Sequence, residues 1–164
     1  MPKGDVRPTS ERARQAFFDI LGDRIGGARF LDLFAGSGIF SFEAVSRGAA
    51  SSVAVDRSRQ HTAAIDRLAK DFGVPVETVT ADALAGMTRL RDRVFDVIYA
   101  DPPYDYAQYD ALLAKIDAEV QLAPGPVVAI EHRRRSHPWT SEPQRLRFTR
   151  RAEYGEVWID FFTT

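Results

Sequence analysis

The four consecutive residues Asp101-Pro102-Pro103-Tyr104 are the part of this sequence that points most directly to chemistry. They follow the apolar run 95–100, which is typical of a buried strand. Proline has no N–H and a fixed φ, so the carbonyls of Asp101 and Pro102 are left to accept hydrogen bonds from another molecule. A nucleobase amine could donate to the Asp101 carboxylate and the Pro102 carbonyl while its ring stacks on Tyr104, as in enzymes that modify an extruded base. We therefore take all four residues as candidate catalytic residues; the alternative is a Pro-Pro turn that ends a strand.

Acidic residues also stand near the ends of the other predicted strands. Asp32, Asp56, Asp82 and Asp101 each lie at or just beyond the carboxyl end of one of the first four strands. In an open α/β sheet this edge is where ligands bind. Any one of these acids could be a helix cap or a loop residue, but four in series indicate a binding site.

A glycine-containing turn, residues 32–38, joins the first predicted strand to a helix and resembles the dinucleotide fingerprint, with Ser41 at the third glycine position. Asp56 is placed to bind ribose hydroxyls, and Asp82, beside Ala83, to accept from an adenine amine. A Tyr-x-x-x-Lys hydride-transfer pair is not seen, and Asp-Pro-Pro-Tyr suits methyl transfer, so S-adenosylmethionine is favoured over a dinucleotide. The candidate cofactor-binding residues are Asp32, Phe34, Ala35, Gly36, Ser37, Gly38, Asp56, Arg57, Asp82, Ala83 and Asp101.

The elements that must position these residues alternate between strand and helix. The pattern predicts strands at 29–34, 52–56, 76–80, 95–100 and 127–131, and helices at 9–21, 37–47, 58–72, after Asp82 and at 106–120. Residues 146–151 and 156–162 have no helix between them and predict an antiparallel hairpin at the edge of the sheet. This is an α/β fold with a doubly wound, mostly parallel sheet and helices on both faces. We expect one domain, 1–164, with an N-terminal motif and helix (1–22) and a catalytic sheet (23–164).

The composition excludes several classes of protein. The chain has no cysteine, which excludes disulfides and thiolate metal sites, and no apolar run near the roughly 20 residues that span a bilayer. His132 and His137 lack a convergent set of acids, so we expect no metal site. Because the amino terminus lacks a signal-peptide core, we expect a cytoplasmic protein.

The charge of the chain is unevenly distributed. The whole chain has a formal charge of −1, but seven arginines and only two acids lie between Glu131 and Arg151. This segment could neutralise phosphates, or it could be the solvated face of a surface strand. Glu131 ends the fifth predicted strand, where it could contact a substrate or make a structural hydrogen bond. The arginines are Arg133, Arg134, Arg135, Arg145, Arg147, Arg150 and Arg151.

Several motifs together make the chain resemble the RsmD family, which methylates a guanine exocyclic amine in bacterial small-subunit ribosomal RNA. They are Arg-Pro-Thr-Ser-Glu-Arg (7–12), the glycine turn (31–38), Glu-Ala (43–44), Ser-Arg-Gly-Ala (46–49), Asp-Pro-Pro-Tyr (101–104), Glu-His (131–132) and Tyr-Gly (154–155). The resemblance implies a Rossmann-like class I methyltransferase with a seven-stranded sheet whose final strand lies antiparallel between its neighbours. It also implies that Asp32, Asp56 and Asp82 contact the cofactor, and that Arg7 and Arg12 help close the site. Family members usually have about a strand pair before the first motif, which is expected to help hold RNA; here six residues precede Arg7.

The resemblance implies an S-adenosylmethionine-dependent guanine-amine methyltransferase whose partner is small-subunit ribosomal RNA or the assembling small subunit, and we expect a monomer. The candidate RNA-binding residues are Arg7, Arg12, Arg133, Arg134, Arg135 and Arg147. Because the reference pKa of Asp is about 3.9, we expect the amine to lose its proton after methyl transfer. The alternatives are an adenine-amine methyltransferase acting on DNA or RNA, and a non-catalytic RNA-binding assembly factor. A separate target-recognition segment is not visible, which disfavours sequence-specific DNA methylation.

Overall fold

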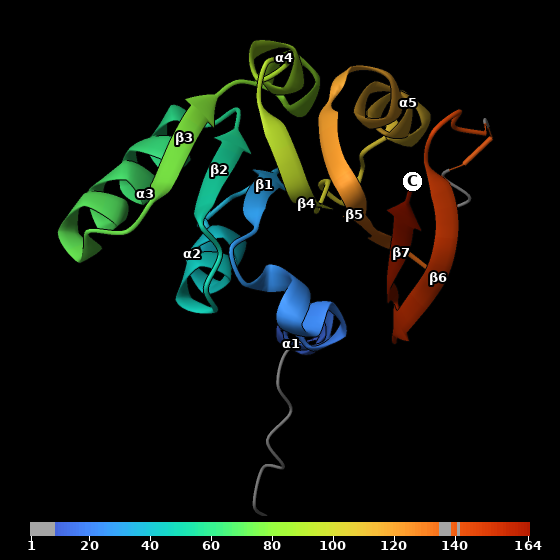
Figure 1. Ribbon diagram of the computed structural model, residues 1–164, viewed down its shortest axis with the longest axis horizontal. Coiled ribbons are helices and arrows are strands. Elements are labelled where there is room, and N and C mark those ends of the chain that lie inside the picture. The colour runs from blue at the N-terminus through green and yellow to red at the C-terminus, as the bar shows by residue number, and fades with distance from the viewer. Residues whose placement is uncertain (1–8, 135–138, 141) are drawn as a thin grey trace, which may run out of the picture.

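The computed structural model describes residues 9–134, 139–140 and 142–164, which build one seven-stranded sheet with helices on both faces (Figure 1). The strands are β1 (Arg29–Leu33), β2 (Ser51–Asp56), β3 (Val76–Thr80), β4 (Val94–Ala100), β5 (Gln121–Arg133), β6 (Arg147–Tyr154) and β7 (Val157–Thr163). The helices are α1 (Thr9–Leu21), the short 3-10 helix η1 (Gly22–Ile25), α2 (Ile39–Ser46), α3 (Arg59–Phe72), α4 (Ala83–Arg89) and α5 (Tyr109–Glu119). The α/β class expected from the alternating pattern is confirmed.

The strands are arranged in the order β3-β2-β1-β4-β5-β7-β6. β1 to β5 pair in parallel, whereas β7 runs antiparallel between β5 and β6. The expected C-terminal hairpin and the position of the final strand are therefore confirmed. The chain moves outward from β1 in one direction through β2 and β3 and in the other through β4 and β5. The carboxyl ends of β1 and β4 thus flank the switch point, where open α/β sheets bind ligands.

Helices α1, α2 and α3 cover one face of the sheet, and α4 and α5 cover the other (Figure 1). Under α1, the buried rings of Phe17 and Phe18 pack on Phe30 of β1 and Tyr99 of β4. Phe40 of α2 stacks on Tyr99 with ring centroids 3.9 Å apart. This aromatic layer packs against the carboxyl end of β4 at Tyr99, two residues before the Asp-Pro-Pro-Tyr segment begins.

The observed element boundaries differ from those expected where a local feature interrupts the pattern. Helix α2 begins at Ile39, not residue 37, because Gly38 adopts a positive φ of 80°. Helix α5 begins at Tyr109, not residue 106, because the Tyr106 N–H donates to the Pro103 carbonyl and prolongs the turn. Strand β5 begins six residues early, at Gln121, since it continues to pair with β4 across an irregular register. None of these differences moves a candidate residue away from the strand ends.

Candidate active site

The turn after β1 is built by backbone conformations that few residues adopt. Phe34 has φ of 61°, in the left-handed region where a non-glycine residue is uncommon, and Gly36 has φ of 57°. A Cβ on Gly38 would lie 2.8 Å from Cγ1 of Ile65 in α3, so only glycine fits this close approach. The Gly36 N–H donates to Oδ2 of Asp56 at 2.8 Å, which ties the turn to the end of β2.

Asp32, which the sequence placed among the cofactor ligands, lies inside β1 and is only 2% exposed. Its Oδ2 accepts hydrogen bonds from the Ser41 N–H at 3.1 Å and the Ser41 hydroxyl at 2.8 Å. Burial raises the pKa of Asp32 to about 7, although the bonds from Ser41 act in the opposite direction. Its carboxylate thus holds the start of α2, and Ser41, at the third glycine position of the fingerprint, is its partner.

A pocket of about 490 Å³ opens at the carboxyl ends of β1, β2, β3 and β4. Three of the four predicted acids line it, whereas Asp32 does not. The predicted residues on its wall are Phe34, Asp56, Arg57, Asp82, Ala83, Asp101 and Pro103. It is also lined by Val55, Ser58, His61, Ala81, Tyr106 and Gln108, none of which was among the candidates. Tyr106 and Gln108 follow the Asp-Pro-Pro-Tyr segment closely, and this proximity was the available signal in the sequence.

Two acids on the pocket wall also organise the backbone around it. Asp56 accepts from the N–H groups of Gly36 and Ser58, and its Oδ1 lies 3.1 Å from Nδ1 of His61. Asp82 caps α4 by accepting from the N–H groups of Leu84 and Ala85. The helix-cap reading of Asp82 is therefore correct. Each carboxylate oxygen can accept more than one hydrogen bond, so both acids remain able to bind a ligand.

The wall between these acids and Asp101 is aromatic. The rings of Phe34 and Tyr106 meet edge to face with centroids 5.1 Å apart, and Tyr106 contacts Tyr109 in the same way at 5.2 Å. Burial, and secondarily the charge of Asp82, raise the pKa of Tyr106, which keeps its hydroxyl neutral. The pocket thus combines apolar walls with acceptor groups, as the site of a nucleoside requires.

Asp101 stands on the rim of this pocket, directly after β4. Although the residue is exposed there, protein atoms surround its carboxylate on the other sides, and this raises its pKa to about 7. The neighbouring carboxylates of Glu131 and Asp32 raise the pKa further, whereas Arg133 lowers it. A carboxyl group that titrates near neutrality can exchange a proton during a reaction at ordinary pH.

The rest of the Asp-Pro-Pro-Tyr segment leads from the pocket to the surface. Pro102 is buried and Pro103 lines the pocket, while the ring of Tyr104 is 81% exposed. The Arg133 guanidinium lies over that ring, 5.5 Å from its centroid. Tyr104 is therefore not a core residue, and its ring offers a flat apolar surface three residues after Asp101.

Glu131 lies close to this group because β5 is the neighbour of β4. The Tyr99 hydroxyl donates to Oε2 of Glu131, so the structural bond considered from the sequence is present. Burial raises the pKa of Glu131, while the bond from Tyr99 and the charge of Arg133 lower it. Asp101, Glu131 and Arg133 thus influence one another electrostatically, and of the three only Asp101 is among the residues that line the pocket.

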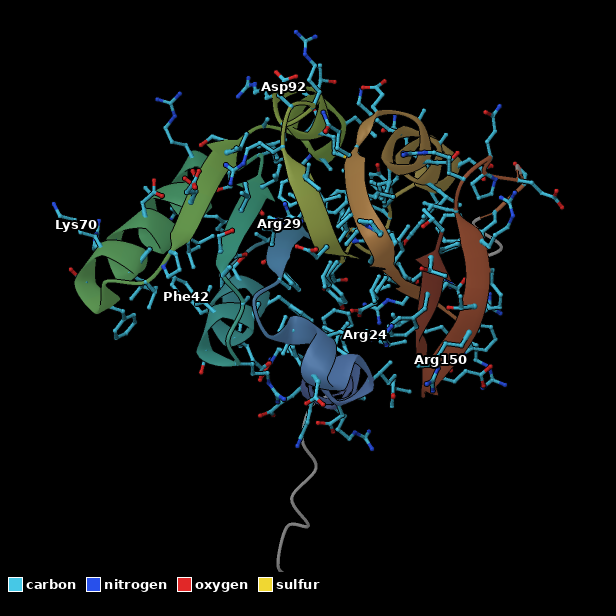
Figure 2. The ribbon with its side chains drawn as sticks, viewed as in Figure 1. Arg24, Arg29, Phe42, Lys70, Asp92 and Arg150 are labelled. Atoms are coloured by element: carbon cyan, nitrogen blue, oxygen red, sulfur yellow. The ribbon has the colours of Figure 1, made fainter. Side chains whose placement is uncertain are left out.

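The other candidate arginines have different surroundings. Arg12 on α1 and Arg134 after β5 are exposed, whereas Arg7 and Arg135 lie outside the described residues. The Arg147 guanidinium donates to the carbonyls of Pro143, Gln144 and Leu146. Arg150 lies at the outer strand of the hairpin (Figure 2). Their binding of RNA stays a prediction.

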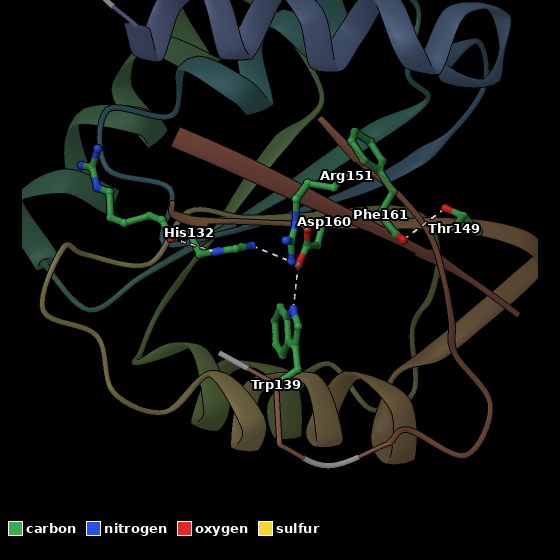
Figure 3. Close-up of polar contacts among 7 residues, drawn as sticks. His132, Trp139, Thr149, Arg151, Asp160 and Phe161 are labelled. Atoms are coloured by element: carbon green, nitrogen blue, oxygen red, sulfur yellow. Dashed lines mark hydrogen bonds and ion pairs between the residues drawn. The ribbon is translucent and has the colours of Figure 1, made fainter. Parts of the chain in front are cut away.

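Two arginines of the basic segment hold the fold together. Arg145 donates to the carbonyls of Ile116, Asp117 and Val120 at the end of α5. Arg151 forms an ion pair with the buried Asp160 at 2.6 Å, and Asp160 also binds His132 and Trp139 (Figure 3). His137 lies outside the described residues. Within the described ranges, no three His, Cys, Asp or Glu side chains gather as a metal site requires, and no helix is long and apolar enough to cross a membrane.

Comparison with known sequences gives matches over most of the chain. The family described as conserved hypothetical protein 95 matches residues 1–163. Ribosomal RNA small subunit methyltransferase D of Buchnera aphidicola is 33% identical over 101 residues, which cover 61% of this chain and 53% of the relative. The putative rRNA methyltransferase YlbH of Bacillus subtilis is 32% identical over 133 residues, 79% of this chain and 72% of the relative. The match therefore spans about half the length of one relative and nearly three quarters of the other.

Comparison with solved structures finds the same arrangement of strands and helices. The structure of the putative methyltransferase yhhF from Escherichia coli matches with a TM-score of 0.83 at 22% identity, over 99% of this chain and 90% of its own. The Rossmann-like methyltransferase fold expected from the sequence is confirmed.

Proposed function

This chain belongs to the family described as conserved hypothetical protein 95, the RsmD family, and we propose that it transfers a methyl group from S-adenosylmethionine to a guanine exocyclic amine in small-subunit ribosomal RNA. The relatives described as ribosomal RNA methyltransferases support a ribosomal RNA substrate. The observation that carries the proposed chemistry is the position of Asp101, on the rim of a nucleoside-sized pocket and beside an exposed tyrosine.

The described pocket fits the adenosine part of the cofactor. Asp56 and Asp82 offer acceptors for ribose hydroxyls and an adenine amine, and the rings of Phe34 and Tyr106 offer apolar contact. When bound, S-adenosylmethionine supplies a methyl group on a positively charged sulfur, which is the electrophile. Asp32 is proposed to act indirectly, by fixing the start of α2 through Ser41.

Asp101 and Pro102 are proposed to hold the substrate amine. The carboxylate and the Pro102 carbonyl accept its two N–H groups, which aims the nitrogen lone pair at the methyl group. Tyr104 stacks on the base, an interaction worth about 1–3 kcal/mol. Arg133 lies beside this platform and can pair with a neighbouring phosphate or base.

Asp101 is also proposed to take the proton that the amine loses. The nitrogen lone pair forms the new N–C bond, the electrons of the broken S–C bond remain on sulfur, and the proton passes from nitrogen to the carboxylate. With the reference pKa of Asp, about 3.9, the amine would lose its proton only after methyl transfer. With a pKa of about 7, Asp101 can accept the proton as the N–C bond forms.

The first experiment is to incubate the protein with radiolabelled S-adenosylmethionine and small-subunit ribosomal RNA, either naked or in small subunits from a strain that lacks the corresponding methyltransferase. Digestion to nucleosides identifies the labelled group. We expect label on the guanine exocyclic amine in one of the two substrates. Label on an adenine amine would support the alternative methyltransferase, and cofactor binding without label would support a non-catalytic RNA-binding factor.

A further inference from the structure

Glu131 is held where it can contact the same base as Asp101. In the parallel pairing of β4 and β5, Tyr99 lies beside Ala129 and Ala100 beside Ile130, so Asp101 and Glu131 occupy the next positions along the two chains. Side chains alternate between the faces of a sheet, which puts Tyr99, Asp101 and Glu131 on one side. The hydrogen bond from the Tyr99 hydroxyl engages one carboxylate oxygen of Glu131, Oε2. A carboxylate has further lone pairs available for another donor.

Arg133 adds a donor next to this acceptor. It lies two residues beyond Glu131 on β5 and therefore on the same side of the strand, and its guanidinium reaches the ring of Tyr104. The electrostatic influence of Arg133 on both Asp101 and Glu131 places the three side chains in one group. A base stacked on Tyr104 thus meets two carboxylates and one guanidinium.

This combination matches one base edge better than another. Guanine presents three adjacent groups, the N2 amine, the N1–H donor and the O6 acceptor. Adenine presents its N6 amine next to N1, which is an acceptor. If Asp101 holds the reactive amine, the next position on the edge is a donor in guanine and a lone pair in adenine.

We propose that Glu131 determines the choice of base by accepting the N1–H of guanine, with Arg133 donating to O6. This inference rests on the proposed function and assigns its specificity to residues of β5. Adenine bound through its N6 amine would direct the N1 lone pair at the Glu131 carboxylate. A site that hydrogen-bonds a substrate group rejects an analogue lacking that group strongly, because the polar groups of the site remain unpaired.

The test uses 2,6-diaminopurine, which keeps the N2 amine of guanine but has an acceptor at N1 and an amine in place of O6. The nucleotide that the wild-type protein labels is first mapped. Small-subunit ribosomal RNA is then prepared by ligation with guanine, 2,6-diaminopurine or adenine at that position. We expect the wild-type protein to methylate guanine at least about 100-fold faster than 2,6-diaminopurine, measured as kcat/KM for N2 transfer.

The decisive variant is Glu131→Gln, whose amide can donate to an N1 acceptor while its oxygen still accepts from Tyr99. We expect the preference for guanine to fall to about tenfold or less, mainly because guanine becomes a poorer substrate. Tyr99→Phe is the matched control, since it removes the structural bond and leaves the carboxylate. It should keep the wild-type preference even if its rate is lower. Calorimetry that measures cofactor binding by both variants shows that each is folded.

The outcomes separate this inference from the proposed function. If the wild-type protein labels guanine and Glu131→Gln retains its preference, the function stands and the role of Glu131 is wrong. A loss of preference in Tyr99→Phe equal to that in Glu131→Gln would assign a structural role to Glu131 and overturn the inference. If the wild-type protein labels adenine, both the guanine specificity and its explanation fail.

Discussion

Asp101 and Asp160 are both aspartates whose pKa is strongly shifted, but in opposite directions. Asp160 in β7 has no exposed side-chain surface and accepts from Arg151, His132 and Trp139 (Figure 3). These hydrogen bonds outweigh the effect of burial, so the pKa of Asp160 lies well below the usual value. For Asp101, burial of the carboxylate and then the neighbouring carboxylates of Glu131 and Asp32 raise the pKa to about 7.

The difference is the one expected between a carboxylate that holds the fold together and one proposed to take part in a reaction. Every donor around Asp160 comes from the protein, so its bonding is complete before any ligand arrives, and its ion pair joins β6 to β7. Asp101 lies on the rim of a pocket and is stabilised poorly by the protein itself. We therefore expect changes at Asp160 to lower stability and changes at Asp101 to lower activity.

The largest effect is expected from Asp160→Asn. The amide cannot accept from all three donors, and its NH₂ group opposes them, so unfolding should become easier by on the order of 3 kcal/mol. Denaturant titration of the wild-type and variant proteins measures the difference. Because the pKa of Asp160 is lowered in the folded state, the difference should be full above about pH 4 and disappear as the pH falls further. If the variant remained less stable by the same amount in acid, the stabilisation by Asp160 would not depend on its charge.

Asp101→Asn should have the converse effect. We expect single-turnover methyl transfer to fall by at least about 100-fold, since the variant lacks the charge that stabilises the developing positive nitrogen and cannot take its proton. Stability near pH 8 should not decrease, because the substitution removes a charge that the folded protein disfavours. A variant that kept nearly the full rate would show that the carboxylate is not the reactive group.

An arginine lies over an aromatic ring both near Asp160 and near Asp101, and this permits a matched pair of substitutions. Arg151 is 4.5 Å from the ring centroid of Trp158, which is half-buried, whereas Tyr104 under Arg133 is 81% exposed. Tyr104→Ala should reduce kcat/KM for RNA about tenfold through lost stacking and leave the melting temperature nearly unchanged. Trp158→Ala should instead lower the melting temperature and leave kcat/KM for RNA nearly unchanged. Tyr104→Phe, which keeps the ring, should retain most of the activity.

The smallest predicted effect is in the pH dependence. The pKa of Asp101 is raised to about 7, so the carboxylate loses its charge as the pH falls. One pH unit below that midpoint, kcat/KM should be about tenfold lower than its plateau value at high pH. In Glu131→Gln a neighbouring negative charge is absent, so the midpoint should move to lower pH. The pKa of Asp32 is also raised to about 7, but Glu131 is not among the groups that shift the pKa of Asp32. A midpoint that stays fixed in the variant would assign the titration to Asp32.

The fold was largely predictable because its signals are local. The apolar runs of β1 to β4 are flanked by turn residues, and Gly73 and Gly155 adopt the positive φ values that end α3 and turn the final hairpin. Errors arose where the context was not local. Strand β5 begins at Gln121 because it pairs with β4, and no pattern in Gln121–Pro126 indicated this.

For the site, the sequence by itself determined which residue types stand at the strand ends, since strand and turn patterns place Asp56, Asp82 and Asp101 at one edge of a parallel sheet. Only the tertiary structure decided which of the candidate side chains are buried and which groups they contact. It buried Asp32 under Ser41, placed Glu131 beside Asp101 across two strands, and directed Arg151 and Arg145 to partners within the protein. The physical reason is that position along a strand is a local property, whereas burial and charge depend on residues brought together from distant parts of the chain.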